Sequence, residues 1–303
     1  MEKRQLGRHD VYVTPIGFGA AQIGYLNLAV DEAAVVLNGV LDSGINVIDT
    51  AACYPNSEEL IGATIAKRRD EYVLVTKCGH KTEESDPPEW SPEIIRHSAE
   101  RSLRRLRTDH LDLLLLHSCD VDVLENDRVI EELVRCKRDG LTRLIGYSGE
   151  NEAAEKAVAM GVFDCLETSI SIADQQVLER WLLATYRAGM GVFAKRPVAN
   201  TAWRDLSNYS EMYVNYSATY RERIRAMGLS PASVGFDGEW IEMALRFTAW
   251  QPGVSSILVG SRTPGHLEEN ARLIAKGPLP EAVVQAIRET WKRCDDGTWV
   301  GQV

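Results

Sequence analysis

The feature that most constrains the fold of this chain is an alternation, repeated eight times, between short apolar segments and longer segments of helical periodicity. The apolar segments contain five or six residues, and many are rich in β-branched side chains, which favour strands. Seven of the eight follow a helix-like segment, and glycine often stands between the two, as it does at the ends of many helices. The predicted strands are residues 16–20, 45–49, 72–76, 111–116, 143–147, 163–168, 191–195 and 255–260.

Strands that alternate with helices form a parallel sheet, and eight such units are the number that closes a (β/α)8 barrel. A length of 303 residues suits one such barrel as a single domain. We therefore predict an α/β fold of the TIM-barrel class over residues 1–303, with a doubly wound open sheet as the alternative. The segment RQLGRHDVYVTPI, with Gly7 at a turn, predicts a β-hairpin across the bottom of the barrel.

The alternation stops between residues 197 and 235, where the chain is rich in Trp and Tyr and helical from about Glu211. Segments inserted after barrel strands lie on the active-site face. Trp203 and Tyr209 are therefore candidates for substrate contact, while packing of these aromatics on the barrel is the alternative. In the C-terminal tail, residues 295–303, Trp299 is expected either to cover the pocket or to pack on the barrel side.

Composition narrows the range of partners. The hydrophobic fraction of 45% and charged fraction of 26% are ordinary for a globular protein with a large core. A net charge of −10 argues against a nucleic-acid partner, which needs a basic face. The first ten residues lack the apolar core of a secretory signal, and the apolar run 113–116 is far too short to span a bilayer. Because of this short run we expect no membrane partner, and six cysteines without a C-x-x-C pair indicate a reduced, cytoplasmic protein.

Ionisable side chains end three consecutive predicted strands. Asp49, Lys77 and His117 occupy these positions, and Tyr54 follows in the loop after Asp49. The carboxyl ends of barrel strands meet at one mouth. An ammonium lowers the pKa of a neighbouring phenol, which is ordinarily about 10, and a carboxylate keeps that ammonium charged. The four side chains thus predict a device that donates a proton to a carbonyl oxygen while hydride reaches its carbon, although Asp49 as a turn cap and Tyr54 as a loop residue is the alternative.

The segments GINVIDTAACY, SEELIG, YVLVTKCG, DLLLLH, GVFAKRP and SSILVGSRTPGHLEEN resemble, in this order and over the whole chain, those of the aldo-keto reductase superfamily. The resemblance implies a (β/α)8 barrel that reduces carbonyls with a nicotinamide cofactor, usually NADPH. It implies that Tyr54 is the general acid and that Lys77 lowers its pKa. It further implies that Asp49 is the counter-charge of Lys77 and that His117 orients the substrate.

The resemblance also implies a cofactor lying across the top of the barrel. GFGAAQIG lacks the third glycine of the dinucleotide fingerprint, whereas Gly260, Ser261 and Arg262 lead into a helix N-terminus suited to a phosphate. The implied cofactor contacts are Gly19, Ala20, Asp49, Ser148, Glu167, Lys195, Arg196, Pro197, Gly260, Ser261, Arg262, His266, Glu269 and Asn270. The candidate substrate contacts are Tyr54, His117, Trp203 and Trp299.

Three residues depart from the family pattern. Glu167 stands where Gln is common, and its negative charge should favour the oxidised, positively charged nicotinamide. Lys195 occupies the position of an aromatic residue, and His266 that of an arginine. We expect NADP(H), with NAD(H) as the alternative, because Arg262 alone can bind a 2′-phosphate in fork geometry.

Three cysteines, Cys53, Cys78 and Cys119, flank the proposed catalytic residues. We expect them to fill tight positions in the loops, with a reactive thiol near Lys77 as the alternative. Their spacing fits no zinc pattern, so we expect no metal.

The sequence therefore predicts an oxidoreductase that transfers hydride from NADPH to a small-molecule aldehyde or ketone and, in reverse, oxidises an alcohol. The alternatives are a non-catalytic nicotinamide-sensing protein on the same barrel and a phosphate-binding isomerase or aldolase. We expect substrate specificity to lie in the loops 22–30, 78–91, 118–127 and 197–230.

Overall fold

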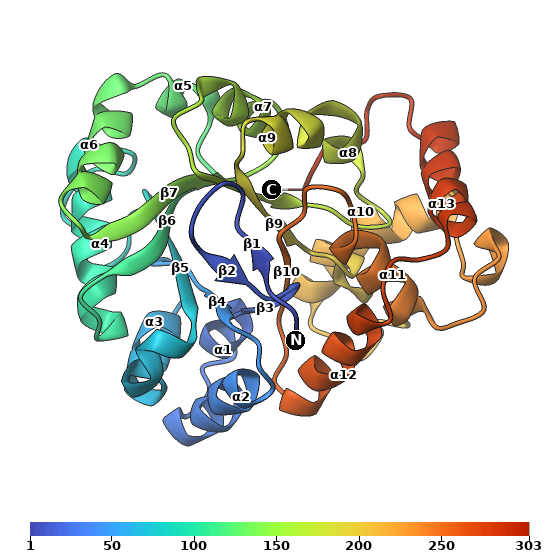
Figure 1. Cartoon of the computed structure of the whole chain (residues 1–303), viewed down its shortest axis with the longest axis horizontal. Coiled ribbons are helices and arrows are strands. Elements are labelled where there is room, and N and C mark those ends of the chain that lie inside the picture. Colours follow the sequence, from blue (N-terminus) through green and yellow to red (C-terminus); the bar gives the residue numbers. More distant parts are fainter. Residues whose placement is uncertain (303) are drawn as a thin grey trace.

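The computed structural model, which describes residues 1–302, is built around a closed barrel of eight parallel strands (Figure 1). The predicted (β/α)8 barrel is confirmed, and every predicted strand overlaps one of the observed strands. In their order around the barrel these are β10 (Ser256–Val259), β3 (Ile16–Gly19), β4 (Val47–Asp49), β5 (Val73–Cys78), β6 (Leu111–His117), β7 (Thr142–Ser148), β8 (Cys165–Ser169) and β9 (Gly191–Lys195).

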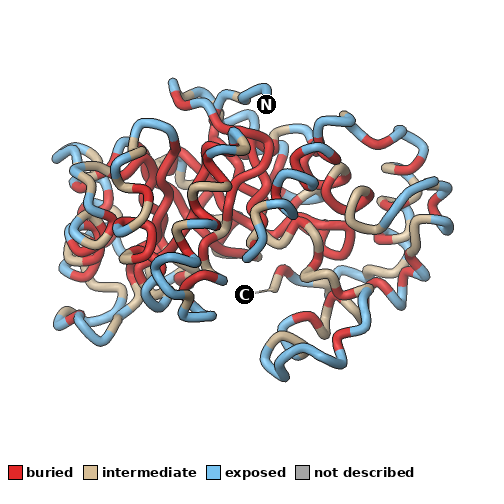
Figure 2. The backbone as a smooth tube through the Cα atoms, turned by 90° about the horizontal axis from the view of Figure 1, so that it is seen from below, coloured by how far each residue is buried: buried red, intermediate tan, exposed pale blue. Residues whose placement is uncertain are grey.

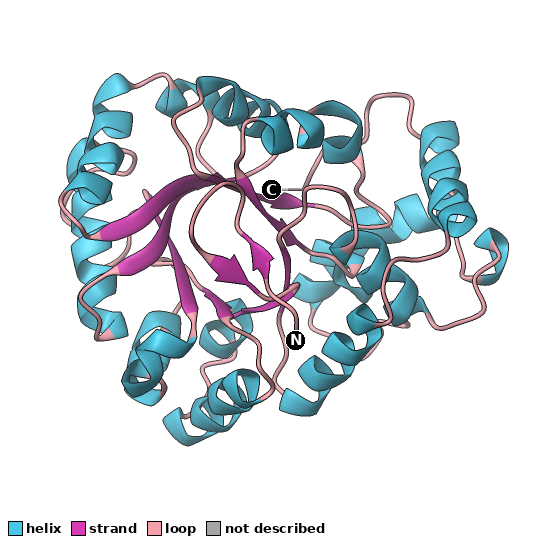
Figure 3. Cartoon of the chain, in the orientation of Figure 1, coloured by secondary structure: helices cyan, strands magenta, loops and turns pink. Residues whose placement is uncertain are grey.

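Helices surround the barrel as an outer layer (Figure 3). The helix α2 shows why they pack there, because its buried residues Ala33, Val36, Leu37, Val40 and Leu41 recur every three or four positions on one face. No helix within residues 1–302 is long and apolar enough to cross a membrane. The helices of this layer are α1 (Ala21–Tyr25), α2 (Val30–Asp42), α3 (Ser57–Thr64), η1 (Ala66–Glu71), α4 (Pro92–Leu106), α5 (Val121–Leu124), α6 (Asp127–Arg138), α7 (Asn151–Met160), α8 (Gln176–Arg180), α9 (Leu182–Arg187), α11 (Trp240–Ala249), α12 (Pro264–Ala275) and α13 (Glu281–Cys294).

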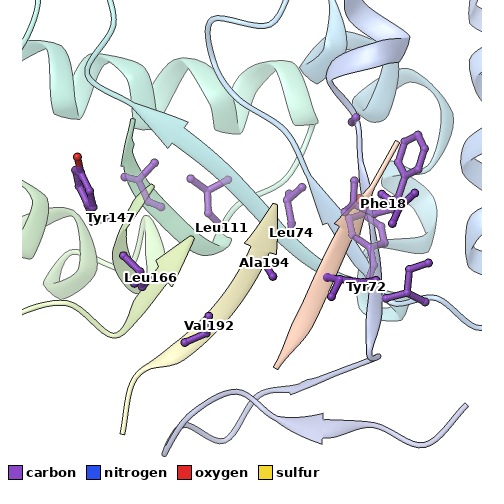
Figure 4. Packing of buried hydrophobic residues seen from close by; sticks show 14 of the residues in the cluster. Phe18, Tyr72, Leu74, Leu111, Tyr147, Leu166, Val192 and Ala194 are labelled. Atoms are coloured by element: carbon purple, nitrogen blue, oxygen red, sulfur yellow. The ribbon is translucent and has the colours of Figure 1, made fainter. Parts of the chain in front are cut away.

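Side chains of the barrel strands alternate between two apolar clusters, since successive residues of a strand point to opposite faces. Phe18, Leu74, Tyr147 and Leu166 belong to the cluster between strands and helices (Figure 4). The strand residues of the other cluster fill the barrel interior. They are Val47, Val73, Val75, Leu113, Leu115, Leu144, Cys165, Phe193 and Leu258.

The predicted N-terminal hairpin is present and closes one end of the barrel. Its strands β1 (Arg4–Gln5) and β2 (Tyr12–Val13) pair antiparallel. Leu6, Val11 and Val13 of the hairpin join the apolar cluster of the barrel interior. Figure 2 shows the N-terminus at this end of the molecule and the last described residues near the other. The hairpin therefore seals the bottom and leaves the carboxyl ends of the strands as the open mouth.

After β9 the chain forms an additional group of helices before α11 (Figure 1). This group contains the short 3-10 helices η2 (Ala199–Thr201) and η3 (Ala232–Val234) and the α-helix α10 (Glu211–Ala226), which begins at Glu211 as predicted. Residues from these elements, α11 and α13 form a second apolar cluster that includes Tyr220, Phe247 and Trp291.

The hairpin turn yields a test of how tightly it seals the barrel. Gly7 has a positive φ of 57°, and a Cβ built there would lie 2.3 Å from the Gly189 carbonyl oxygen, whereas Gly44 has a positive φ of 81° with nothing within 4 Å of such a Cβ. We expect Gly44→Ala to lower the free energy of unfolding by about 1 kcal/mol through backbone strain alone. We expect Gly7→Ala to lower it by about 2–4 kcal/mol, because overpacking adds to strain. Equal losses for both variants in urea unfolding would contradict tight packing of the hairpin.

Candidate active site

The mouth of the barrel is lined by eight residues, seven from the ends of strands and the eighth, Gly260, directly after β10. Each lies two positions after a residue that faces the barrel interior, and therefore points inward as well. Most of the predicted site residues on the strands thus share one layer. The eight positions are Gly19, Asp49, Lys77, His117, Ser148, Glu167, Lys195 and Gly260.

Lys77 is the most buried charged group of this layer, with 1% of its surface exposed. Its Nζ donates to Asp49 Oδ1 at 2.5 Å and to the Thr50 carbonyl oxygen at 2.9 Å. Glu167 Oε2 lies 3.4 Å from the same nitrogen as a second carboxylate. The structure therefore brings the predicted pair Asp49 and Lys77 together and adds Glu167 to it.

The charges of this group shift one another. Burial alone would lower the pKa of Lys77, but Asp49 and Glu167 together raise it above its ordinary value, so the amine is an ammonium. Burial, together with the charge of Glu167, raises the pKa of Asp49 to about 8 against the lowering effect of Lys77.

Tyr54 lies over this group in the loop between β4 and α3. Its ring centre is 5.7 Å from Lys77 Nζ. The loop is fixed from below, where Ser57 Oγ lies 2.8 Å from Thr50 Oγ1 and donates to the Ala20 carbonyl oxygen at 3.0 Å. The guanidinium of the buried Arg101 donates to the Ala52 carbonyl oxygen at 3.0 Å, so the position of Tyr54 does not rest on the loop alone.

Burial raises the pKa of Tyr54 above its ordinary value. Lys77 acts in the opposite direction and lowers it, as the sequence predicts, while Asp49 and Glu167 raise it further. The phenol is therefore protonated at neutral pH, and the acidifying effect of Lys77 is partly cancelled by its two counter-charges.

His117 stands beside Tyr54, with ring centres 5.9 Å apart and planes at 81°. Burial and the nearby charge of Lys77 lower the pKa of His117 well below its ordinary value, so the imidazole is neutral. Its Nδ1 shares a 3.4 Å hydrogen bond with Cys53 Sγ. A neutral imidazole has one donor and one acceptor nitrogen, and can therefore donate a single hydrogen bond to a substrate oxygen.

Several neighbours of this site do not follow from the sequence pattern. Tyr25 approaches Tyr54 with ring centres 5.7 Å apart, and His80 approaches His117 at 5.1 Å. His80 in turn packs against Trp90 and pairs with Glu89 at 2.8 Å. All four belong to the loops 22–30 and 78–91, so the sequence indicates the segments but gives no signal that selects the residues.

A second charged group lies on the other side of the mouth, around the buried Glu150. Glu150 Oε1 lies 3.2 Å from Lys195 Nζ and 3.6 Å from Arg196 Nη1, and its carboxylate accepts hydrogen bonds from Ser169. The sequence analysis misses Glu150, although it stands two residues beyond the inward-facing Ser148. Lys195, which replaces an aromatic residue of the family pattern, is thus held by a carboxylate.

The C-terminal segment reaches this group. Gly301 exchanges two hydrogen bonds with the Asn151 side chain, at 2.7 and 3.1 Å, and the Gln302 carbonyl oxygen accepts from Arg196. A Cβ at Gly301 would lie 2.8 Å from the Glu150 carboxylate. The predicted tail, residues 295–303, therefore borders the mouth as far as residue 302, and Val303 lies outside the described residues.

The predicted cofactor residues surround a cradle at the ends of β3 and β10. A Cβ at Gly19 would lie 3.8 Å from the Gly260 amide nitrogen, so the backbones approach closely without side chains between them. Ser261 leads into α12, whose first turn contains Pro264 and His266. Arg262 and His266 are exposed and form no ion pair within residues 1–302. These features fit a phosphate at the helix N-terminus.

The remaining predicted cofactor contacts are distributed between the mouth and α12. Ser148 Oγ donates to Glu167 Oε1 at 3.0 Å, which leaves Glu167 Oε2 without a hydrogen bond in the described chain. The Ala20 amide extends the ladder by donating to the Asp49 carbonyl oxygen, and the Pro197 carbonyl oxygen accepts from Thr248. On α12, Asn270 is buried and Glu269 pairs with Arg272 at 2.7 Å.

The two tryptophans predicted to contact substrate pack in the second apolar cluster. Trp203 stacks on Trp240 with ring centres 5.1 Å apart, and Trp299 meets Trp291 edge-on at 4.9 Å. These contacts agree with the alternative interpretation of the two tryptophans, in which they pack against the barrel and its helices.

The structure argues against a reactive thiol at the site. Cys78 and Cys119 are buried, and burial raises the pKa of both thiols as well as that of Cys53 despite the nearby Lys77. Cysteine reactivity requires the thiolate, so these side chains act as packing residues. Residues 1–302 contain no group of three His, Cys, Asp or Glu side chains arranged to hold a metal ion.

The barrel, with a buried lysine–carboxylate group beneath a tyrosine and a histidine, defines a class of carbonyl oxidoreductases, and comparison with known proteins gives the family. A family model described as the Aldo/keto reductase family matches residues 15–292. The chain belongs to this family of NAD(P)H-dependent oxidoreductases, which confirms the resemblance and the predicted enzyme class.

The chain is similar to several full-length relatives. The uncharacterized oxidoreductase YqkF of Bacillus subtilis is 28% identical, with 97% of each chain covered. L-galactose dehydrogenase of Arabidopsis thaliana is 26% identical, over 91% of this chain and 89% of the relative. Among solved structures, aldo-keto reductase AKR11C1 of Bacillus halodurans in its holo form superposes with a TM-score of 0.82 at 28% identity, with 96% of each chain covered.

The charge arrangement around Lys77 predicts the effect of removing the ammonium. Lys77→Met should lower the free energy of unfolding by about 3–5 kcal/mol, because two buried carboxyl groups lose their partner. The pKa of Asp49, about 8 with the ammonium present, should rise further without it, so the loss should grow as pH rises from about 7 to about 9.

A matched control is Arg143→Met, which removes one half-exposed partner of Asp112 while Arg69 still pairs with it. This change should cost less than about 1 kcal/mol. Unfolding of both variants followed by circular dichroism at the two pH values measures the difference, and a pH-independent loss for Lys77→Met would contradict the buried-charge account.

Proposed function

We propose that this protein reduces an aldehyde or ketone with NADPH and, in reverse, oxidises the alcohol. Tyr54 is the general acid, Lys77 the cation that favours its phenolate, Asp49 the counter-charge of Lys77, and His117 the group that orients the substrate. The observation that supports this most strongly is the ammonium of Lys77, held by Asp49 and the Thr50 carbonyl oxygen 5.7 Å from the ring centre of Tyr54.

When bound, the nicotinamide supplies hydride to the carbonyl carbon. The phenol of Tyr54 donates its proton to the carbonyl oxygen as negative charge develops there, and Lys77 stabilises the phenolate that remains. The neutral His117 donates a second hydrogen bond to the same oxygen, which fixes the carbonyl between two donors.

The proposed cofactor site runs from the mouth to α12. Ser148 and Glu167 would receive the carboxamide, while Lys195, Arg196 and Pro197 border it. Gly19, Ala20, Gly260 and Ser261 would cradle the phosphates, and Glu269 and Asn270 would contact the adenine. Arg262 and His266, both exposed beside the N-terminus of α12, favour NADPH over NADH because a 2′-phosphate adds negative charge there.

The first experiment follows NADPH absorbance with a panel of reactive aldehydes, including a nitrobenzaldehyde, for wild type and Tyr54→Phe. L-galactose with NADP⁺ is tested in the oxidising direction because of the relative with that activity. We expect turnover in wild type and a loss of at least about 100-fold in Tyr54→Phe, since general acid catalysis contributes that much.

The control is cofactor binding, which Tyr54→Phe should retain in a fluorescence titration. Tight binding without turnover by wild type would favour the alternative of a nicotinamide-sensing protein. Absence of cofactor binding would refute the proposed function, and full activity of Tyr54→Phe would refute the assignment of the acid.

Arg262→Ala tests the cofactor preference. We expect this variant to bind NADPH about 10–100-fold more weakly, because a charge-assisted hydrogen bond to the 2′-phosphate is lost, and to bind NADH unchanged. Lys276→Ala, at the opposite end of α12, is the matched control for one lost positive charge and should leave both affinities unchanged. Equal weakening of NADPH and NADH by Arg262→Ala would contradict recognition of the 2′-phosphate.

A further inference from the structure

Two carboxylates face the single ammonium of Lys77. Its Nζ donates to Asp49 and to the Thr50 carbonyl oxygen, and its remaining side faces Glu167 Oε2 at 3.4 Å. Glu167 is 3% exposed, and this oxygen is buried without a hydrogen bond in the part of the chain that the structure describes. The group of Asp49, Lys77 and Glu167 therefore contains one more acidic than basic side chain, and all three side chains are buried.

The surroundings do not balance this excess. Tyr54 and Cys53 are uncharged near neutral pH, because burial raises the pKa of each, and His117 is neutral because burial lowers its pKa. Ser148, on the neighbouring strand, contributes only a hydroxyl.

The cations on the far side of the mouth are engaged elsewhere. Lys195 and Arg196 both face Glu150, which is itself buried. A buried group with an unbalanced negative charge tends to hold a proton. The pKa of about 8 for Asp49 agrees with this count.

We propose that Glu167 makes the group of Asp49, Lys77 and Glu167 a proton-holding site that releases its proton when the oxidised nicotinamide binds, so that the mouth prefers the oxidised over the reduced cofactor. This inference rests on the proposed function, which puts the nicotinamide beside Ser148 and Glu167. The oxidised ring carries a positive charge that the reduced ring lacks, and a positive charge favours the ionised form of nearby carboxyl groups.

Proton release and cofactor preference are linked. If the oxidised cofactor weakens the binding of the proton by some factor, loss of the proton strengthens the binding of the oxidised cofactor by that same factor. The ratio of the two affinities, oxidised over reduced, should therefore rise about fivefold between pH 7 and pH 8, as pH approaches the pKa of Asp49, and level off above it. Glu167→Gln removes one acidic group at nearly constant shape, so this dependence should disappear.

The test is isothermal titration calorimetry of wild type and Glu167→Gln with NADP⁺ and with NADPH at about pH 7, in two buffers of different ionisation enthalpy. Wild type should release about one proton more with NADP⁺ than with NADPH, and Glu167→Gln should release equal numbers with both. Both dinucleotides have the same 2′-phosphate, so its own titration cancels in the comparison.

Glu155→Gln is the matched control, because it removes an exposed carboxylate on α7 that pairs with Arg180. It should behave as wild type. Glu167→Asp, which keeps a carboxylate, should restore part of the extra proton release.

The outcomes separate this inference from the proposed function. Binding of both cofactors by wild type with equal proton release would overturn the inference and leave the proposed function standing. Extra release that persists in Glu167→Gln would also overturn it. Failure of wild type to bind either cofactor would refute the proposed function and the inference with it. The wild-type comparison remains decisive even if Glu167→Gln does not fold.

Discussion

The site depends on keeping one buried ammonium group, that of Lys77, charged. Transfer of a lysine side chain out of water costs several kcal/mol unless carboxylate and carbonyl oxygens surround it. Asp49 can do this only because β4 pairs with β5 in a register that sets Asp49 opposite Val75, one inward-facing position below Lys77. The Thr50 carbonyl oxygen completes the arrangement, and the loop that follows Thr50 carries Tyr54. The register of β4 and β5 and the position of the Tyr54 phenol are therefore both tied to the Lys77 ammonium.

The mouth contains as many acidic as basic side chains, although they are unevenly divided between its two sides. Three buried carboxylates, Asp49, Glu167 and Glu150, face three cations, Lys77, Lys195 and Arg196. Two of the carboxylates surround one cation on one side, and two of the cations surround one carboxylate on the other. Once the group of Asp49, Lys77 and Glu167 has released its proton, the mouth is polarised across its width, and it then presents a negative and a positive side to one extended ligand without a large net charge.

The sequence predicts the barrel well because the eight strands carry their signal locally, in apolar runs separated by helical periodicity. It also predicts the inward layer of Asp49, Lys77 and His117, since the period of two residues carries the interior pattern of each strand on to its end. It does not predict Glu150 or the pairing of Lys77 with Glu167, because these depend on distances between strands far apart in the chain. The net shift in the pKa of Tyr54 could not be predicted either. Burial raises this pKa by more than Lys77 lowers it, and the sequence pattern does not show how deeply Tyr54 is buried. The packing of Trp203 on Trp240 and of Trp299 on Trp291 follows from helices whose positions the sequence leaves open.

The close approach of Gly301 to Glu150 has a consequence for how such a chain can vary. A side chain at position 301 would press against the carboxylate that holds Lys195 and Arg196, so the residue at 301 is restricted by a residue 151 positions earlier. Variation at the two positions should therefore be correlated. A homologue with a smaller residue in place of Glu150 is free to carry a side chain in place of Gly301, whereas one that keeps the glutamate and this path of the chain must keep the glycine.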